Sequence, residues 1–398
     1  MKRNLLVTTF AILLIAMSGI SCSNTGSSDF DRQVDHALDF SVRQLKATVA
    51  AITDSTQLPV STLPDGTWKT GTIYDWRSGH YPGCLWLAYE YSGDEVLKAA
   101  AEKWTGALEP IKDYTGNHDV GFMIYCSYGQ GYRLTGNKAY EPVMVKAAES
   151  LSTRYKPTTG VIQSWKAGEK WKFPVIIDNM MNLELLFWAH KNGGNTNLYA
   201  ISVEHADITV KNHIRENGST FHVVDYDPET GEARARNTAQ GYADDSTWSR
   251  GQAWGVYGYT MTYRETGNTL YLDTACRLAD FFIDNLPEDN VPYWDFNAPN
   301  IPNEPRDTAA AAVAASGLLE LSTHVKDKQQ GERYYGAALD ILGSLCSPEY
   351  LTEGTNSPGL LQHATSSVPH DSEIDVSLIY GDYYFLEALL RYKRGIEQ

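Results

Sequence analysis

Apolar residues recur along this chain with the 3.6-residue period of amphipathic helices, and strand-like alternation is scarce. The pattern predicts an all-α protein of about twelve helices. They are expected near residues 30–53, 80–92, 94–108, 118–134, 138–153, 177–191, 196–214, 246–265, 269–285, 306–323, 329–345 and 374–393. The best strand candidate is residues 220–226, which the turn sequence of residues 227–231 ends.

A short polar sequence separates four pairs of these helices. It reads SGD at 92–94, TGN at 135–137, GGN at 193–195 and TGN at 266–268. Glycine ends a helix in the left-handed conformation, and Asp or Asn caps the next helix. Helices paired by such tight turns can close as a ring of six hairpins, and an open solenoid is the alternative.

Long connections recur after every second predicted helix. They cover residues 54–79, 154–176, 215–245, 286–305 and 346–373. In a ring of hairpins they lie at one end, and long connections within a compact domain usually carry function. We therefore expect the functional site at that end.

Composition excludes some classes of protein and leaves others open. Hydrophobic residues make up 42% and charged residues 21% of the chain, which favours a folded core over disorder. The net charge of −16 argues against nucleic-acid binding, and an anionic substrate would need local positive groups. The 25 Tyr and 10 Trp suit sugar stacking, but they also suit an ordinary large core.

The N-terminus has the features of a bacterial secretion signal. Residues 1–4 are basic and residues 5–17 form an apolar run that is too short to span a membrane. Cys22 follows small residues and precedes a polar tether, which resembles a lipoprotein processing site, although ordinary cleavage nearby is the alternative. We expect residues 1–22 to be a signal peptide, 23–29 a tether and 30–398 one domain. The protein would then be exported, to the periplasm or to a membrane through a lipid at Cys22.

The remaining cysteines and the histidines predict no special chemistry. Cys84, Cys126, Cys276 and Cys346 are far apart in apolar helical contexts, so free thiols are favoured over disulfides. The ten His residues lack metal-ligand spacing such as HExxH, and neither a phosphate-binding loop nor GxSxG is present. We expect no metal and no cofactor.

Asp178 is the one carboxylate in the apolar run of residues 175–181. Loss of water around such a carboxyl raises its pKa, and a carboxyl that keeps its proton near neutral pH suits a general acid. The alternative is an N-cap for the helix that follows.

Two more segments join polar side chains to apolar helices. Residues 117–123 read NHDVGFM, and residues 240–255 combine amides, Arg250 and two Trp residues. Structural alternatives exist for each: Asp119 and Ser246 as N-caps, Trp254 as a core residue, and Arg250 paired with Asp244 or Asp245.

Four separated motifs in this order resemble glycoside hydrolase family 88, the unsaturated glucuronyl hydrolases. They are the run of residues 117–122, the Asp178 run with Asn182, FHVVD at 221–225 followed by PETG at 228–231, and WSRGQAW at 248–254. The resemblance extends from Trp76 to Tyr392. A sister family that acts on unsaturated rhamnogalacturonides shares the fold and is the second choice.

The resemblance implies an (α/α)6 barrel and a hydration reaction. The substrate would be an oligosaccharide left by a polysaccharide lyase, with a C4=C5 double bond in its non-reducing uronic acid. Asp178 would protonate C4 and then help a water molecule to add at C5. Asp119 would hold ring hydroxyls, and its charge would raise the pKa of Asp178 if the two lie close together.

The resemblance also implies residues that line the sugar site. His222 and Arg250 would supply polar and charge contacts, and Trp254 would stack or form a wall. The full set is His222, Gln240, Arg250 and Trp254, with Trp76 or Trp86 as a further sugar platform. Family members that prefer sulfated glycosaminoglycans carry a Ser…Ser…Lys arrangement before the last helix. Residues 363–373 here contain hydroxyls but no Lys, so the sequence leaves sulfation preference open.

Two other hypotheses remain at this stage. The chain is either a carbohydrate-binding lipoprotein that has lost catalysis or a helical scaffold for protein partners. Asp119 and Asp178 are both present, which speaks against the first.

Overall fold

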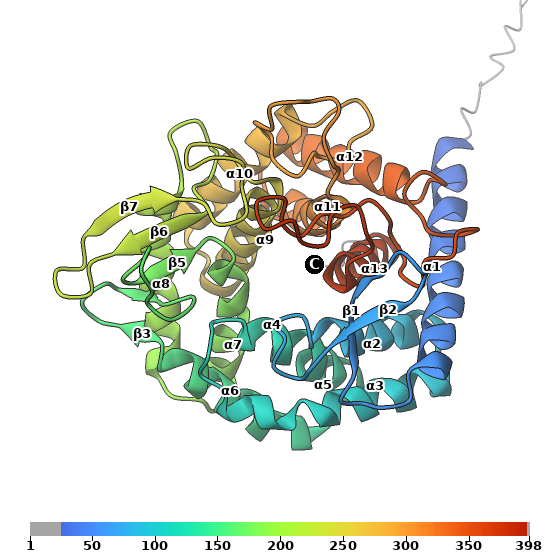
Figure 1. The fold of residues 1–398 in the computed structure, drawn as a ribbon, viewed down its shortest axis with the longest axis horizontal. Helices are drawn as coiled ribbons and strands as arrows, with labels where there is room; N and C mark the ends of the chain where they lie inside the picture. The colour runs from blue at the N-terminus through green and yellow to red at the C-terminus, as the bar shows by residue number, and fades with distance from the viewer. Residues whose placement is uncertain (1–24, 396–398) are drawn as a thin grey trace, which may run out of the picture.

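The chain forms two concentric rings of helices (Figure 1). The structure is a computed structural model and describes residues 25–395. The outer ring contains α1 (Thr25–Ala51), α3 (Glu95–Ala107), α6 (Glu141–Ser152), α8 (Asn197–His213), α10 (Thr269–Asp284) and α12 (Lys328–Leu345). The inner ring contains α2 (His80–Ser92), α4 (Val120–Ile124) with α5 (Gln130–Thr135), α7 (Asn179–Lys191), α9 (Ser249–Thr266), α11 (Thr308–His324) and α13 (Ile379–Lys393).

The inner ring is closed. Helix α13 packs against α11 on one side and against α2 on the other, so the last inner helix meets the first. Each inner helix also packs on an outer neighbour, as in the pairs α9–α10 and α11–α12. The predicted (α/α)6 barrel is confirmed, and the open solenoid is excluded.

The predicted turns between hairpin helices have the expected geometry. Gly93 and Gly267 adopt φ of 65° and 68°, the left-handed region that favours glycine. Asp94 then accepts hydrogen bonds from the backbone N–H groups of Val96 and Leu97, and Asn268 accepts one from Leu270. These turns follow the C-termini of inner helices and lie at the end of the barrel opposite the long connections.

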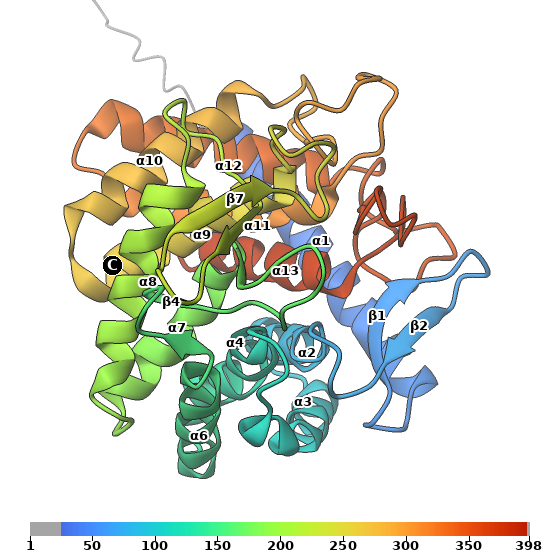
Figure 2. The ribbon, with the colours of Figure 1, turned by 60° about the vertical axis from the view of Figure 1, so that its left-hand side comes forward.

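The long connections lead into the N-termini of the inner helices, so they gather at one end of the barrel as predicted (Figure 2). Inner helices are buried on nearly all sides, and α11 is apolar throughout its middle. Polar residues at the first positions of these helices are the ones that reach the open end.

Three small antiparallel sheets lie among the long connections, and the sequence predicted only one of their strands. Strands β1 (Leu58–Thr62) and β2 (Trp68–Gly71) form a hairpin, and β3 (Tyr155–Lys156) pairs with β4 (Val161–Ile162). An antiparallel sheet has the order β5 (Pro174–Ile176), β6 (Val223–Tyr226) and β7 (Ala233–Asn237). The strand predicted at residues 220–226 is thus confirmed in its second half as β6.

Three details differ from the helix pattern or extend it. The helix predicted at 118–134 is interrupted by a π-helical turn, η2 (Tyr125–Gly129), between α4 and α5. Short 3₁₀ turns, η1 (Glu109–Asp113) and η3 (Lys138–Tyr140), precede α4 and α6. Helix α1 begins at Thr25, so the segment predicted as a tether is helical from that residue on. The predicted signal peptide and Cys22 lie outside the described residues.

The cysteines outside the N-terminal segment are free, as predicted, with Cys84 and Cys126 fully buried. Within residues 25–395 no group of three or more His, Cys, Asp or Glu is arranged to hold a metal ion. None of the helices in that range is long and apolar enough to cross a membrane.

The contact between α9 and α7 gives a test of the barrel packing. A Cβ atom at Gly258 would lie 2.5 Å from the Cβ of Met180, so Gly258→Ala forces the two inner helices apart. We expect it to lower the free energy of unfolding by about 1–3 kcal/mol in urea denaturation. Gly336→Ala on α12 is the control, because nothing lies within 4 Å of its added Cβ; it should stabilise by up to about 1 kcal/mol. Equal effects of the two substitutions would contradict the close approach.

Candidate active site

Two carboxylates stand at the starts of two neighbouring inner helices. Asp119 precedes α4 and Asp178 precedes α7, and these helices pack against each other. The packing is close because a Cβ at Gly121 would lie 2.5 Å from Asn182, whose Oδ1 accepts a hydrogen bond from the Phe122 N–H at 2.8 Å. Both acidic residues occupy N-cap positions, but neither side chain makes a cap hydrogen bond. The predicted N-cap positions are therefore confirmed, but neither carboxylate caps its helix through the side chain.

The Asp178 carboxyl is nearly withdrawn from water. The residue is 8% exposed, and Oδ2 has no hydrogen-bond partner. The His222 ring faces this carboxyl, with its Nε2 3.8 Å from Oδ2. Burial raises the pKa of Asp178 to about 7, although the charge of Arg250 opposes the rise. The proton that the sequence predicted on this group is therefore held near neutral pH.

Asp119 is less deeply buried, with 16% of its side chain exposed. Its Oδ1 lies 3.3 Å from Nε2 of the buried His118. Burial, followed by the charge of Asp178, raises the pKa of Asp119 to about 8, and Arg154 acts against this rise. Because the two carboxyls repel each other when both are charged, the pair holds a proton at neutral pH.

His222 faces Asp178 as a neutral hydrogen-bond donor. Its Nδ1 accepts from the backbone N–H groups of Ala239 and Gln240, both at 3.2 Å, so the ring proton is on Nε2, the nitrogen that faces Asp178. Burial and the charge of Arg250 lower the pKa of His222 well below its usual value. The backbone carbonyl of His222 accepts from the N–H of Ile177, which fixes it beside the Asp178 run.

Arg250 is buried and holds a loop. Its guanidinium pairs with Asp307 and donates to the backbone carbonyls of Thr365 at 2.5 Å and Ser366 at 2.6 Å. Asp307, not Asp244 or Asp245, is thus its partner, which corrects that alternative. With 1% exposure, Arg250 acts on Asp178 through its charge and through the loop, and the predicted direct charge contact with a sugar has little surface available.

Gln240 holds the same loop. Its Nε2 donates to the carbonyl of Ser366 at 3.1 Å, and its backbone N–H donates to His222. The residue is half-buried, and its bond to Ser366 joins the loop after β7 to the wall formed by residues 346–378. Ser246, the other candidate cap, lies before the helix and donates to Asp295 instead.

The three predicted tryptophans have different positions. Trp76 is half-buried and lies against Tyr380 and Phe122, with ring centroids 4.9 Å and 5.8 Å away. Trp254 is 1% exposed and packs between Phe122 and Tyr384, so it lies in the core below the site, as its structural alternative predicted. Only Trp76 of these three has surface to offer a sugar.

The predicted role of Trp86 as a sugar platform needs correction. It is completely buried on the face of α2 that meets α3, and its Nε1 donates to Oγ1 of Thr105 at 2.9 Å. A ring in this position has no free face, so the predicted sugar platform at Trp86 is wrong. The sequence does not separate it from Trp76, because the inner helix α2 is apolar on all sides.

Several side chains at the site were missed. Trp248 lies over the His222 ring with a centroid distance of 4.5 Å, and the Arg250 guanidinium lies 4.5 Å from the same indole. Arg77 binds Asp75 through two hydrogen bonds and also pairs with Glu373 at 2.6 Å, which ties the entry to α2 to the loop before α13. Their position just before inner helices is the signal that points to them.

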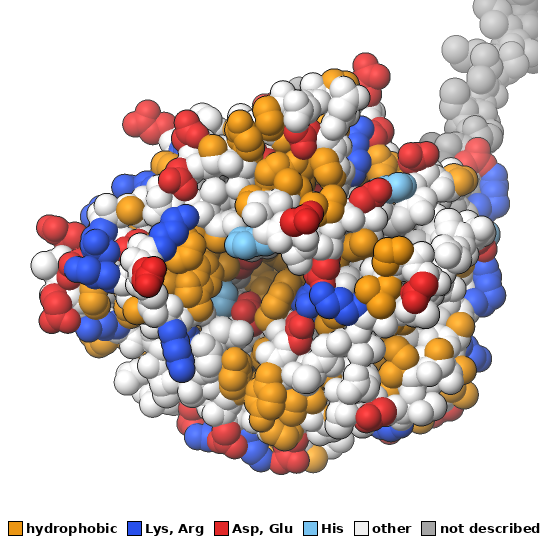
Figure 3. Space-filling model, viewed as in Figure 1, with side chains coloured by type: hydrophobic (Ala, Val, Ile, Leu, Met, Phe, Trp, Pro, Cys, Tyr) orange, Lys and Arg blue, Asp and Glu red, His pale blue; other side chains and the backbone are white. Residues whose placement is uncertain are grey.

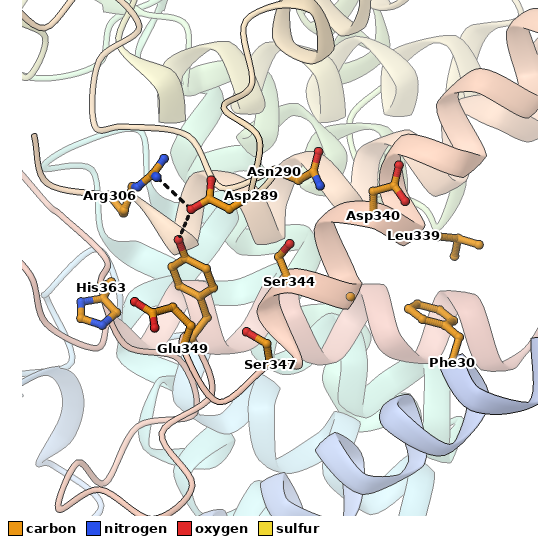
Figure 4. A pocket seen from close by; sticks show the side chains of 12 residues that line it. Phe30, Asp289, Asn290, Arg306, Leu339, Asp340, Ser344, Ser347, Glu349 and His363 are labelled. Carbon is orange, nitrogen blue, oxygen red and sulfur yellow. Dashed lines mark hydrogen bonds and ion pairs between the residues drawn. The ribbon is translucent and has the colours of Figure 1, made fainter. Parts of the chain in front are cut away.

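The face of the barrel that carries these residues is hollowed at its centre, with acidic and histidine side chains on the floor of the hollow (Figure 3). A different groove of about 760 Å³ lies at the start of α1 and beside α12 (Figure 4). There Asp289 pairs with Arg306 and accepts from the Tyr350 hydroxyl. None of the predicted site residues lines this second groove.

The sequence profile of Glycosyl Hydrolase Family 88 matches residues 48–291. The chain belongs to this family. It is 46% identical over 322 residues, 80% of each chain, to an unsaturated glucuronyl hydrolase from Formosa agariphila. It is 33% identical to an unsaturated chondroitin disaccharide hydrolase from Streptococcus agalactiae, with 92% of each chain covered.

Solved structures agree with this assignment. An unsaturated glucuronyl hydrolase specific for heparin superposes with a TM-score of 0.88 at 43% identity, covering 92% of this chain and 98% of that one. The unsaturated glucuronyl hydrolase from Bacillus sp. GL1 gives a TM-score of 0.85 at 31% identity, covering 92% and 97%. This family 88 chain is therefore a glycosidase with the fold of the unsaturated glucuronyl hydrolases.

The raised pKa of Asp178 predicts a stability effect that depends on pH. The folded state holds the proton up to about pH 7 whereas the unfolded chain releases it near 3.8, so the wild type loses stability as pH rises between these values. Asp178→Asn removes this loss. Its advantage over the wild type should grow by about 2 kcal/mol between pH 5 and pH 8 in urea denaturation.

Asp273→Asn, on the exposed face of α10, is the matched control and should show no such growth. A constant difference between Asp178→Asn and the wild type across this range would mean that Asp178 is charged at pH 5.

Proposed function

We propose that this chain hydrolyses lyase-generated oligosaccharides of the glycosaminoglycan type by hydrating the C4=C5 double bond of the non-reducing unsaturated uronic acid. The observation that carries the proposal is the carboxylate pair, Asp119 and Asp178, which holds a proton in a nearly dry site. The relatives named above act on unsaturated glucuronyl substrates, and one solved Streptococcus agalactiae variant is complexed with dGlcA-GalNAc6S.

The reaction begins with proton transfer from Asp178 to C4. The double bond is an enol ether, so protonation at C4 leaves positive charge on C5 and the ring oxygen. Asp178, now a carboxylate, accepts a proton from a water molecule as that water adds to C5. The hemiketal that forms at C5 opens by breaking the C5–O ring bond, which leaves a ketone at C5 and a hemiacetal at C1. The hemiacetal then collapses to an aldehyde by breaking its C1–O bond to the neighbouring sugar, which leaves as an alcohol. Because no nucleophile displaces the leaving group at the anomeric carbon, the usual relation between carboxylate spacing and stereochemistry does not apply.

The neighbours of Asp178 have distinct roles in this proposal. Asp119 accepts hydrogen bonds from ring hydroxyls, and its repulsion helps to keep the proton on the pair. His222 donates its Nε2 proton toward the ring or toward the attacking water, because it is neutral and faces Asp178. Trp76 offers an apolar surface to the sugar, and Arg250 and Gln240 hold the loop at Ser366 that forms a wall of the site.

We also propose that the mature chain is exported and carries a lipid at Cys22. The support is the basic and apolar pattern of residues 1–22 and the small residues before the cysteine. The described domain begins with α1 directly after this segment.

Asp178→Asn should abolish turnover, because the amide has no proton of suitable acidity to give to C4. We expect the rate to fall at least about 10³-fold, measured as loss of the ultraviolet absorbance of the substrate double bond. Trp86→Phe is the control, because it changes an aromatic ring that is buried away from the site; this variant should turn over substrate like the wild type. Binding of an unsaturated disaccharide without consumption by the wild type would favour a catalytically silent carbohydrate-binding protein, and no affinity would favour a scaffold.

A further inference from the structure

One loop connects the surroundings of the two catalytic carboxylates. It begins after Ser164, whose carbonyl accepts from the N–H of His118 at 3.0 Å, next to Asp119. The Ser164 hydroxyl oxygen accepts from the N–H of Ile176, two residues before Asp178. The segment between these anchors, residues 165–173, therefore starts and ends at the rim of the site.

This loop is rich in aromatic and basic residues. Residues 165–172 read WKAGEKWK, and Gly168 N–H donates to the carbonyl of Trp171 to form a turn. The indoles of Trp165 and Trp171 are both half-buried and meet edge to face at 5.4 Å. Lys170 lies over the Trp171 ring at 4.5 Å. Apolar ring faces next to an ammonium group suit a charged sugar.

Lys170 is the cation that connects this loop to the catalytic residues. Its Nζ donates to the carbonyl of Thr238 at 3.2 Å, and the Thr238 hydroxyl lies 3.3 Å from Nδ1 of His222. Lys170 is also among the charges that lower the pKa of His222. The side chain is exposed, and an ammonium has three N–H donors, so two remain for a ligand.

Its charge is not neutralised by the protein. Among the residues that the structure describes, no carboxylate lies within ion-pair distance of Lys166 or Lys170. The next lysine in the loop, Lys172, differs because its ammonium group forms an ion pair with Asp227 at 3.6 Å. Lys170 is thus a free positive charge on a chain with a net charge of −16.

The depth of the carboxylates decides which sugar meets this loop. Asp178 is 8% exposed, so the unsaturated ring that it protonates must lie deep in the site. The sugar to be released then extends toward the rim, where basic side chains lie around the opening (Figure 3). We propose that Lys170, with the Trp165 and Trp171 rings, binds a sulfate group on this released sugar and so sets the preference of the enzyme for sulfated substrates.

This inference rests on the proposed hydration reaction and names the substrate class for it. Residues 363–373 contain no Lys, so a Lys contact with a sulfate group would have to come from another segment, and Lys170 supplies one. The other anion on the substrate is the uronate carboxylate, which is present in every substrate. The two possibilities are separated by comparing substrates that differ only in sulfation.

The test uses two unsaturated uronate–glucosamine disaccharides, one 6-O-sulfated and one without sulfate, and the full-length enzyme. Lys170→Ala should lower kcat/KM for the sulfated disaccharide about five- to tenfold more than for the unsulfated one, mainly through KM. Lys170→Arg should restore most of the difference. Lys172→Ala in the same loop is the matched control and should leave the ratio of the two kcat/KM values unchanged, since its charge is paired with Asp227.

Salt gives a second readout. The preference of the wild type for the sulfated disaccharide should fall as ionic strength rises, and Lys170→Ala should flatten this dependence. Equal losses on both disaccharides would assign Lys170 to the uronate carboxylate and overturn the proposal, as would equal kinetics of Lys170→Ala and the wild type or a wild type that consumes only the unsulfated disaccharide. A wild type that consumes neither would instead refute the hydration reaction itself.

Discussion

Two carboxyl groups at the starts of α4 and α7 are largely shielded from water, Asp178 more than Asp119, and this desolvation is the constraint on which the site depends. Asp119 has the distant opposing charge of Arg154, and Asp178 has that of Arg250, but neither has an ion pair with a Lys or Arg side chain of the described chain. A proton therefore stays on the pair at neutral pH. The enol ether of the substrate must be protonated for hydration to begin. Burial of the two carboxyl groups lowers the stability of the fold, but it also keeps the proton that this step requires.

The barrel makes this arrangement possible. All six inner helices begin at one end, so short polar segments before them converge while the apolar helices below exclude water. Arg250 then joins α9 to Asp307 before α11 and to the loop at Thr365 and Ser366. This one buried guanidinium links α9 to two separate connections and so fixes the loop at Thr365 and Ser366 relative to the helix. Asp382 adds a second anchor because its carboxylate accepts from the N–H groups of Leu360 and Leu361.

Local sequence patterns predicted the parts of the fold that depend on local physics. The helices and the turns at Gly93 and Gly267 followed from apolar period and capping chemistry, and the burial of Asp178 followed from its apolar neighbours. The sheet of β5, β6 and β7 depends on pairing between distant segments and had only one visible strand. The π-helical turn at η2 had no local signal.

Residue roles were harder to predict where the same side chain could lie either in the core or at the site. Trp86 and Trp76 are ten residues apart, yet one is in the core and the other is at the site, since an inner helix buries every side. The true partners of Arg250 lie 57 and more than 100 residues away, so no local pattern indicates them. The Lys170 loop lies in the long connection 154–176 that the sequence predicted, but its nearness to His222 depends on the contact between Lys170 and Thr238, which no sequence pattern indicated.

The state of the carboxylate pair is best measured directly by a ¹³C NMR titration of aspartate carboxyl groups, with the Asp178 signal assigned by its loss in Asp178→Asn. The account predicts that Asp178 titrates near pH 7 in the wild type, and that Asp119 titrates near pH 8 in the wild type and at a lower pH in Asp178→Asn, where the repulsion is gone. A titration midpoint below about 5 in the wild type, close to the ordinary range of an exposed aspartate, would contradict it.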